Sequence, residues 1–100
     1  MSREVTEGPV KQGADEAIRY RIACTPAPVS VVAVNVYDET VDYADVTATC
    51  MPAGSATIND GSIVLPLLQN LTIGHSYRVE VQYSDGISTI EPWIRVIGER

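Results

Sequence analysis

Apolar and polar residues alternate with a period of two along several short stretches of this chain. In residues 77–83, Tyr and Val occupy every second position, and Arg78, Glu80 and Gln82 lie between them. Successive side chains of a β-strand point to opposite faces, so this pattern predicts a strand with one buried and one solvated face. No window of the sequence sustains apolar residues at the spacing of a helix. We therefore predict an all-β protein.

Similar stretches predict about seven or eight strands in all, at the short spacing typical of a β-sandwich. Residues 1–9 are mainly polar and are expected to fray, which leaves residues 10–100 as a single domain. A chain of this length can bury an independent core without a metal or a disulfide. Besides residues 77–83, strands are expected within residues 10–24 (two strands joined by a turn at Gly13), 29–37, 46–51, 55–58, 62–67 and 87–97.

The alternation also assigns a face to each residue of these strands. Along residues 18–24 the predicted core face carries Ile18, Tyr20, Ile22 and Cys24. Along residues 29–37 it carries Val32, Val34 and Val36. Val31 and Ala33 are then expected to point outward. An apolar outer face predicts a neighbour that covers it, so these two residues are candidate contacts with a partner.

Turn residues and prolines mark the ends of the predicted strands. Residues 59–61 (Asn-Asp-Gly) and 84–86 (Ser-Asp-Gly) are tight-turn signals, because Asp and Gly tolerate a positive φ. Proline has no amide hydrogen to give to a ladder, so Pro66 should end its strand or place it on an edge. For the same reason we expect Pro92 to interrupt the last strand with a bulge.

The residues that lead into the strand at 77–83 resemble a known structural motif. Leu71, Gly74 and Tyr77 have the spacing of the tyrosine corner found in immunoglobulin-like and fibronectin type III-like sandwiches. In that motif the phenol hydroxyl bonds back to the backbone a few residues upstream. The resemblance implies a two-sheet antiparallel immunoglobulin-like β-sandwich in which these three residues have a structural role.

Residues 10–97 as a whole resemble small immunoglobulin-like proteins of bacteriophage and prophage structural modules. The shared features are the Gly turn before the first amphipathic strand, the run Gly-His-Ser-Tyr at residues 74–77, and the Ser-Asp-Gly hairpin at residues 84–86. Pro92 departs from the regular last strand of that group, and the group has no diagnostic functional residue to transfer. The resemblance implies a non-enzymatic virion, tail or adaptor subunit that works through its surfaces.

Composition narrows the range of partners. Val and Ile greatly outnumber Leu, and Phe is absent, which favours strands. The formal net charge is −6 and the few basic residues are dispersed, so nucleic acid is not an expected partner. The longest apolar run, residues 63–68, is far shorter than a membrane span. Residues 1–7 lack the apolar segment of a secretory signal, so we expect cytoplasmic synthesis, with virion association as an option.

The two cysteines leave two alternatives open. Cys24 and Cys50 both fall on predicted core faces, so they are either buried thiols or a non-standard disulfide. In the antibody arrangement the second cysteine would lie two residues after the corner tyrosine. Val79 occupies that position, so an antibody-type bridge is not expected.

The acidic segment at residues 38–45 is the best candidate for ligand chemistry. Asp38, Glu39, Asp42 and Asp45 could offer oxygen ligands to calcium, but their spacing matches no calcium loop that we can name. A solvated acidic loop that protects a strand edge is the favoured interpretation, so we predict no metal and no cofactor.

His75 and Trp93 are the other residues with chemical potential. Ser76 and Asp85 are near His75 in the sequence, but no nucleophile elbow or oxyanion-hole motif accompanies them, so we predict no catalytic role. Trp93 is favoured as a core or rim residue, and contact with a ligand is the alternative.

These observations predict a structural or protein-interaction module that docks on partner subunits or on itself and is not an enzyme. The alternative is a small ligand-binding module for carbohydrate or calcium.

Overall fold

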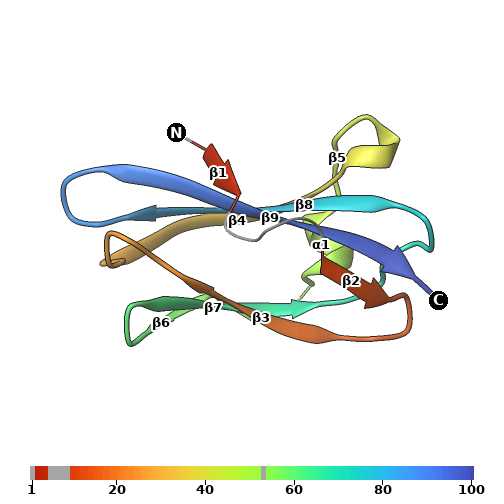
Figure 1. Cartoon of the computed structure of the whole chain (residues 1–100), viewed down its shortest axis with the longest axis horizontal. Helices are drawn as coiled ribbons and strands as arrows, with labels where there is room; N and C mark the ends of the chain where they lie inside the picture. The colour runs from red at the N-terminus through yellow and green to blue at the C-terminus, as the bar shows by residue number, and fades with distance from the viewer. Residues whose placement is uncertain (1, 5–9, 53) are drawn as a thin grey trace.

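The structure, a computed structural model, describes residues 2–4, 10–52 and 54–100 (Figure 1). The described part of the chain is mostly β, as predicted, with one turn of 3-10 helix and one of α-helix. Its elements are β1 (Ser2–Glu4), β2 (Val10–Gly13), β3 (Ile18–Ala23), β4 (Ser30–Asp38), η1 (Glu39–Val41), β5 (Ala44–Asp45), α1 (Thr47–Cys50), β6 (Thr57–Asn59), β7 (Ser62–Leu68), β8 (Ser76–Ser84) and β9 (Thr89–Glu99).

The strands form two sheets that face each other (Figure 1). The larger sheet has the order β1-β9-β8-β4-β5, with β2 also paired to β9, and the smaller sheet has the order β3-β7-β6. The prediction of purely antiparallel pairing is wrong at one edge, because β1 and β2 both pair with β9 in parallel. Ser2–Glu4 lie within the segment expected to fray, and their pairing with β9 corrects that prediction for these three residues. Residues 1 and 5–9 are outside the described part of the chain.

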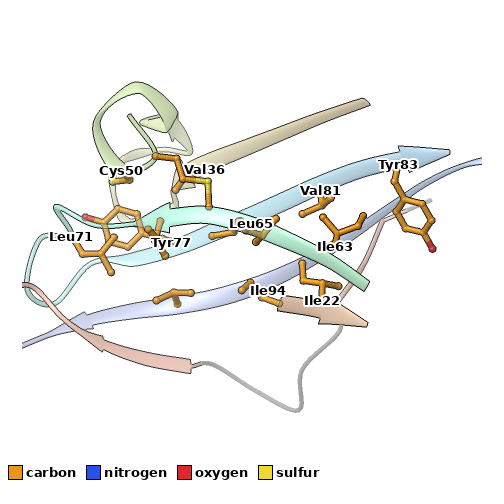
Figure 2. Close-up of a cluster of buried hydrophobic side chains, with 14 of the residues drawn as sticks. Ile22, Val36, Cys50, Ile63, Leu65, Leu71, Tyr77, Val81, Tyr83 and Ile94 are labelled. Carbon is orange, nitrogen blue, oxygen red and sulfur yellow. The ribbon is translucent and has the colours of Figure 1, made fainter. Parts of the chain in front are cut away.

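The core lies between the two sheets and follows the predicted alternation closely in β8 and β9. Tyr77, Val79, Val81 and Tyr83 are buried, and the polar residues between them lie on the outer face. Ile90, Ile94 and Val96 of β9 point to the same side. Figure 2 shows the side chains from both sheets meeting in this layer, with Tyr77 beside Leu71 at one end and Tyr83 at the other.

A β-bulge in β4 changes the predicted faces of that strand. Val31 pairs with Tyr83 and Ala33 pairs with Gln82, so Val32 is the extra residue. A one-residue insertion reverses the alternation on one side of it. Val31 therefore packs against the core, whereas Val32 is 57% exposed, the reverse of the sequence-based prediction for both.

Pro66 lies where β7 is paired on one side only, in agreement with one of the predicted alternatives, whereas Pro92 does not behave as predicted. In the β3–β7 ladder, Arg19 pairs with Leu67 and Arg21 with Val64, which leaves Leu65 and Pro66 together opposite a single residue. Pro66 thus lies at a bulge inside β7, where a ladder amide is not required. The β8–β9 register is the same on both sides of Pro92, so no bulge forms there.

The segment predicted as a strand at residues 46–51 contains the short helix α1 instead. The Val46 amide donates a hydrogen bond to the Val36 carbonyl. The amides of Thr49 and Cys50 then donate hydrogen bonds to the Val46 carbonyl, which closes the helical turn. The helical turn buries both Cys50 and Met51, two consecutive residues, which an alternating strand could not do. Tertiary burial overrides the local β-pattern here.

The two predicted turns are confirmed. Asn59 pairs with Ser62, and the two residues between them, Asp60 and Gly61, both have positive φ, as a tight hairpin with the right-handed twist requires. In the second hairpin the Asp85 carboxylate accepts hydrogen bonds from the amides of Ile87 and Ser88. These bonds hold the pKa of Asp85 below its ordinary value.

A buried glutamine links the two sheets. Gln12 of β2 is fully buried, and its side-chain amide donates to the carbonyl of Leu68 in β7 at 2.8 Å. Its side-chain oxygen accepts a hydrogen bond from the Tyr20 hydroxyl of β3, also at 2.8 Å. Because β2 belongs to the larger sheet and the other two strands to the smaller, these bonds connect the layers.

Both cysteines are free thiols, which decides between the alternatives left open by the sequence. Burial raises the pKa of each thiol. Of the helices that the structure describes, none has the length and apolar character to cross a membrane.

Candidate functional site

The loop between β7 and β8 is fixed by the residues singled out as structural in the sequence. Leu71 and Tyr77 are both buried, and the Tyr77 hydroxyl oxygen accepts a hydrogen bond from the Thr72 amide at 2.7 Å. Gly74 has a φ of +85° and donates its amide to the carbonyl of Gly98 at the end of β9. This loop therefore holds the start of β8 against the end of β9.

The acidic segment packs against this loop. Asp38, the last residue of β4, is 5% exposed, and its carboxylate lies 2.7 Å from Nδ1 of His75. The other carboxylate oxygen of Asp38 accepts a hydrogen bond from the Thr40 amide. Asp38 therefore caps the start of η1. The Thr40 hydroxyl in turn accepts the amide of Ser76. Both ends of this small network are held by backbone groups, which is typical of a structural site.

Glu39 makes the strongest ionic contact at this end of the molecule. Both of its carboxylate oxygens accept hydrogen bonds from the Arg95 guanidinium of β9, at 2.7 and 2.9 Å. The Ser76 hydroxyl donates to one of the same oxygens. The Arg95 contact holds the pKa of Glu39 below its ordinary value. A two-point arginine–carboxylate pair of this kind fixes orientation as well as charge.

These contacts separate the carboxylates that the sequence grouped as calcium candidates. Asp38 binds His75, Glu39 binds Arg95, and Asp45 accepts hydrogen bonds from Thr47. Asp42 contributes a left-handed backbone, with a φ of 53°, at the end of η1. Within the described ranges no three His, Cys, Asp or Glu side chains come together in a way that could hold a metal ion.

The residues considered for catalysis also bind different partners. The Ser76 hydroxyl is directed to Glu39 and the His75 ring to Asp38, so the two neighbours serve different carboxylates. Asp85 lies beyond the opposite end of β8. The arrangement fastens the segment after β4 onto β8 and β9.

Trp93 lies on the outer face of the larger sheet, between two arginines. The alternation of β9 buries Ile94 and leaves Trp93 half-buried on the other side. The guanidinium of Arg78 lies 4.1 Å from the centre of the indole ring and that of Arg95 lies 5.1 Å from it. Cation–π attraction at these distances holds the ring against its own sheet. The sequence predicted a core or rim residue, and the structure places this half-buried ring on the outer face of the larger sheet.

A groove lined by apolar residues and by polar atoms opens beside the exposed part of β4. It has a volume of about 340 Å³ and lies between β4, the segment after α1, and the bulge of β7. Val31 and Val34 contribute to the lining from β4, Met51 from the end of α1, and Pro66 from β7. The remaining lining residues are Val32, Thr47, Gly54, Ser55 and Ala56.

The groove exists because β4 loses its neighbour halfway along its length. β5 pairs only with Tyr37 and Asp38. At the next position of the ladder, the Thr47 hydroxyl takes the place of a strand carbonyl. It accepts a hydrogen bond from the Val36 amide at 2.8 Å. The chain then turns into α1, and within the described chain no strand is hydrogen-bonded to residues 30–35 on this side of the sheet, although β6 comes close to β4.

Of the candidate contact residues, the structure brings one to the groove. Val31 lines it, whereas Ala33 lies level with Gln82 on the outer face of the larger sheet. Sequence reasoning missed Val32, Val34 and Met51 as groove residues, because the bulge and the helix that create the groove leave no periodic signal. It also missed the Asp38–His75 and Glu39–Arg95 pairs, whose members are distant in the sequence.

Comparison with known proteins found no matching family model, no matching curated protein and no matching solved structure for this chain.

Proposed function

We propose that this protein is a non-enzymatic protein-interaction module built on an immunoglobulin-like β-sandwich. The two-sheet arrangement supports this architecture, with β1 and β2 added in parallel at the β9 edge and the remaining strands antiparallel. The hydrogen bond from the Thr72 amide to the Tyr77 hydroxyl supports the interpretation of that loop as a tyrosine corner. The sequence resemblance to phage structural modules adds a virion, tail or adaptor subunit as the expected setting.

The observation that carries the proposed role is the open edge of β4 beside the groove. Val32 is 57% exposed at this edge, next to the half-buried Val31 and Val34 that line the groove. Apolar side chains gathered around an unpaired strand edge lower the free energy when another protein covers them. A monomer would ordinarily protect such an edge with a charge, and here residues 31–34 are Val-Val-Ala-Val.

Ligand binding through Trp93 or the acidic segment has less support. Two guanidinium groups already pack on the Trp93 ring, and Arg95 is also held by Glu39. A sugar would have to displace these contacts before it could stack on the ring.

Site-specific photo-crosslinking of the full chain tests the interaction role. A photo-reactive amino acid replaces Val32 at the open edge or, as the control, Ile73, which has a similar exposure of 53% and lies in the β7–β8 loop. In cells that express the gene naturally, we expect irradiation to join a discrete protein to the Val32 probe and not to the Ile73 probe. Equal labelling at both positions, or none at either, would contradict the proposal.

A further inference from the structure

At its open edge, β4 has backbone hydrogen-bonding groups that are not paired with another strand among the residues that the structure describes. The amide and carbonyl of Val36 both point toward this edge, since they bond to Thr47 and Val46. Alternate residues of an antiparallel strand direct their backbone groups to the same side. The amide and carbonyl of Val34 therefore point to the same edge, past the point where β5 ends. Groups of this kind are matched by another extended backbone.

The groove lies where the side chains of such an added strand would point. Residues opposite each other in neighbouring strands share a face of the sheet. Val31 and Val34 face the groove, so the inward side chains of an added strand would enter it between Val34 and Met51. Its volume of about 340 Å³ is enough for apolar side chains of ordinary size. The inward positions of the occupant should therefore be apolar.

The outward side chains of an added strand would meet negative charge. Asp45 lies at the end of β5 on the same edge, and hydrogen bonds from Thr47 hold its pKa below the ordinary value. Glu80 lies on β8 across from Asn35 of β4, where it forms an ion pair with Arg78 of the same strand at 2.6 Å. The pKa of Tyr37 on this face is raised by burial and by the charges of Glu80, Asp45 and Glu91.

The arginines of the same face make their contacts within the larger sheet. The Arg78 and Arg95 guanidinium groups pack on Trp93 of β9, on the far side of β8 from β4. Arg78 also forms an ion pair with Glu80, so the negative charge beside the open edge comes from Asp45. A second copy of this chain, with its own formal charge of −6, would be repelled, whereas Lys or Arg side chains would be attracted.

We propose that the open edge of β4 accepts an extended segment of a partner protein in which apolar residues alternate with basic ones. The segment adds a strand at the Val34 backbone, places its apolar side chains in the groove, and directs its basic side chains toward Asp45. This inference rests on the proposed function and assigns to it a mode of binding and a partner chemistry.

Amide exchange measured by NMR on the full chain tests this mode. The probe is a synthetic peptide of about twelve residues in which Val alternates with Lys, and the matched control peptide has Glu in place of Lys. At saturation with the Lys peptide we expect exchange of the Val34 amide to slow by about tenfold or more, because it becomes hydrogen-bonded. The Glu peptide should bind about tenfold more weakly or worse, because of like-charge repulsion.

Two variants of equal exposure show whether binding occurs at this edge. Val32→Lys removes an apolar contact and repels the basic peptide, so its affinity should fall by about tenfold. Ile73→Lys adds the same charge at the opposite end of the molecule and should leave the affinity within about twofold. Equal losses in both variants would overturn the proposal, because they would indicate a general charge effect.

Three other results would also overturn it. The first is a Lys peptide that does not bind, or that binds without slowing the Val34 amide. The second is equal binding of the Glu peptide. The third is slowing of the Val34 amide as the protein alone is concentrated, which would place a second copy at the edge. Crosslinking at Val32 together with an unchanged Val34 amide would refute this mode of binding and leave the interaction role intact.

Discussion

At the scale of single residues, Glu39 shows how a candidate ligand acquires a structural role. The sequence places it in an acidic segment, and the structure places Arg95 against both of its oxygens. The pair joins the segment after β4 to β9, although the two residues are 56 positions apart in the chain. A solvated acidic loop was the favoured prediction, and it is wrong for Glu39 and for the buried Asp38. Nothing local in the sequence marks a carboxylate whose partner lies on a distant strand.

The Glu39–Arg95 pair predicts a specific dependence of stability on pH. The folded state holds the pKa of Glu39 below its ordinary value of 4.5. The resulting stabilisation is present above that value and is lost as the pH falls through the lower, folded-state pKa. In Glu39→Gln, the free energy of unfolding should therefore decrease less steeply on acidification than in the parent protein.

Urea denaturation from neutral to acidic pH measures this difference. Asp15→Asn is the control, because Asp15 is exposed in the β2–β3 turn. Its acid profile should follow that of the parent. Parallel profiles for Glu39→Gln and the parent would show that the Arg95 contact does not stabilise the folded state.

At the scale of elements, turns follow the sequence closely and strand interiors follow it less well. The Asp60-Gly61 hairpin forms where local chemistry predicts it, because positive φ is a property of the residue itself. The bulges at Val32 and Pro66 and the helix α1 were not predicted. Each of them resolves a conflict between local pattern and burial that arises only when the sheets pack together.

Substitution of Gly61 should change the free energy of unfolding through backbone conformation alone, because a new side chain would meet no neighbouring atoms. Gly61 has a φ of +79°, and a Cβ there would meet nothing within 4 Å. Gly61→Ala should lower the free energy of unfolding by about 1–2 kcal/mol, because an alanine is strained in this conformation. Gly61→Asn should lose less, since asparagine adopts the left-handed region more readily. Chemical denaturation of both variants provides the measurement, and equal stability of Ala and Asn would contradict the explanation.

At the scale of the whole molecule, the two sheets are joined by polar as well as apolar contacts. Gln12 is the clearest polar connection, because it lies in the larger sheet and bonds to residues of the smaller one. Its side-chain amide also donates to the Glu16 carbonyl at 3.0 Å. A buried group with all of its hydrogen bonds made specifies one relative position of the two layers.

Removal of this connection should destabilise the entire domain. Gln12→Leu keeps a side chain of similar size but leaves the Leu68 carbonyl and the Tyr20 hydroxyl without their partner. Buried groups left in this state cost about 1–3 kcal/mol each, so we expect a loss of about 2–5 kcal/mol in the free energy of unfolding. Lys11→Leu in the same strand is exposed and should change little. A loss below about 1 kcal/mol for Gln12→Leu would show that Gln12 does not hold the sheets together.

The sequence by itself determined the β class, most strand positions, both hairpin turns and the buried face of β8, because period-two alternation and turn chemistry are local properties. Only the tertiary structure decided where β4 bulges, why the chain leaves the sheet at Thr47, and which distant side chains meet Asp38 and Glu39. These features depend on how two sheets share one core and on contacts between residues far apart in the chain. The open edge and its groove follow from them, so the proposed binding site belongs to the fold and not to any motif.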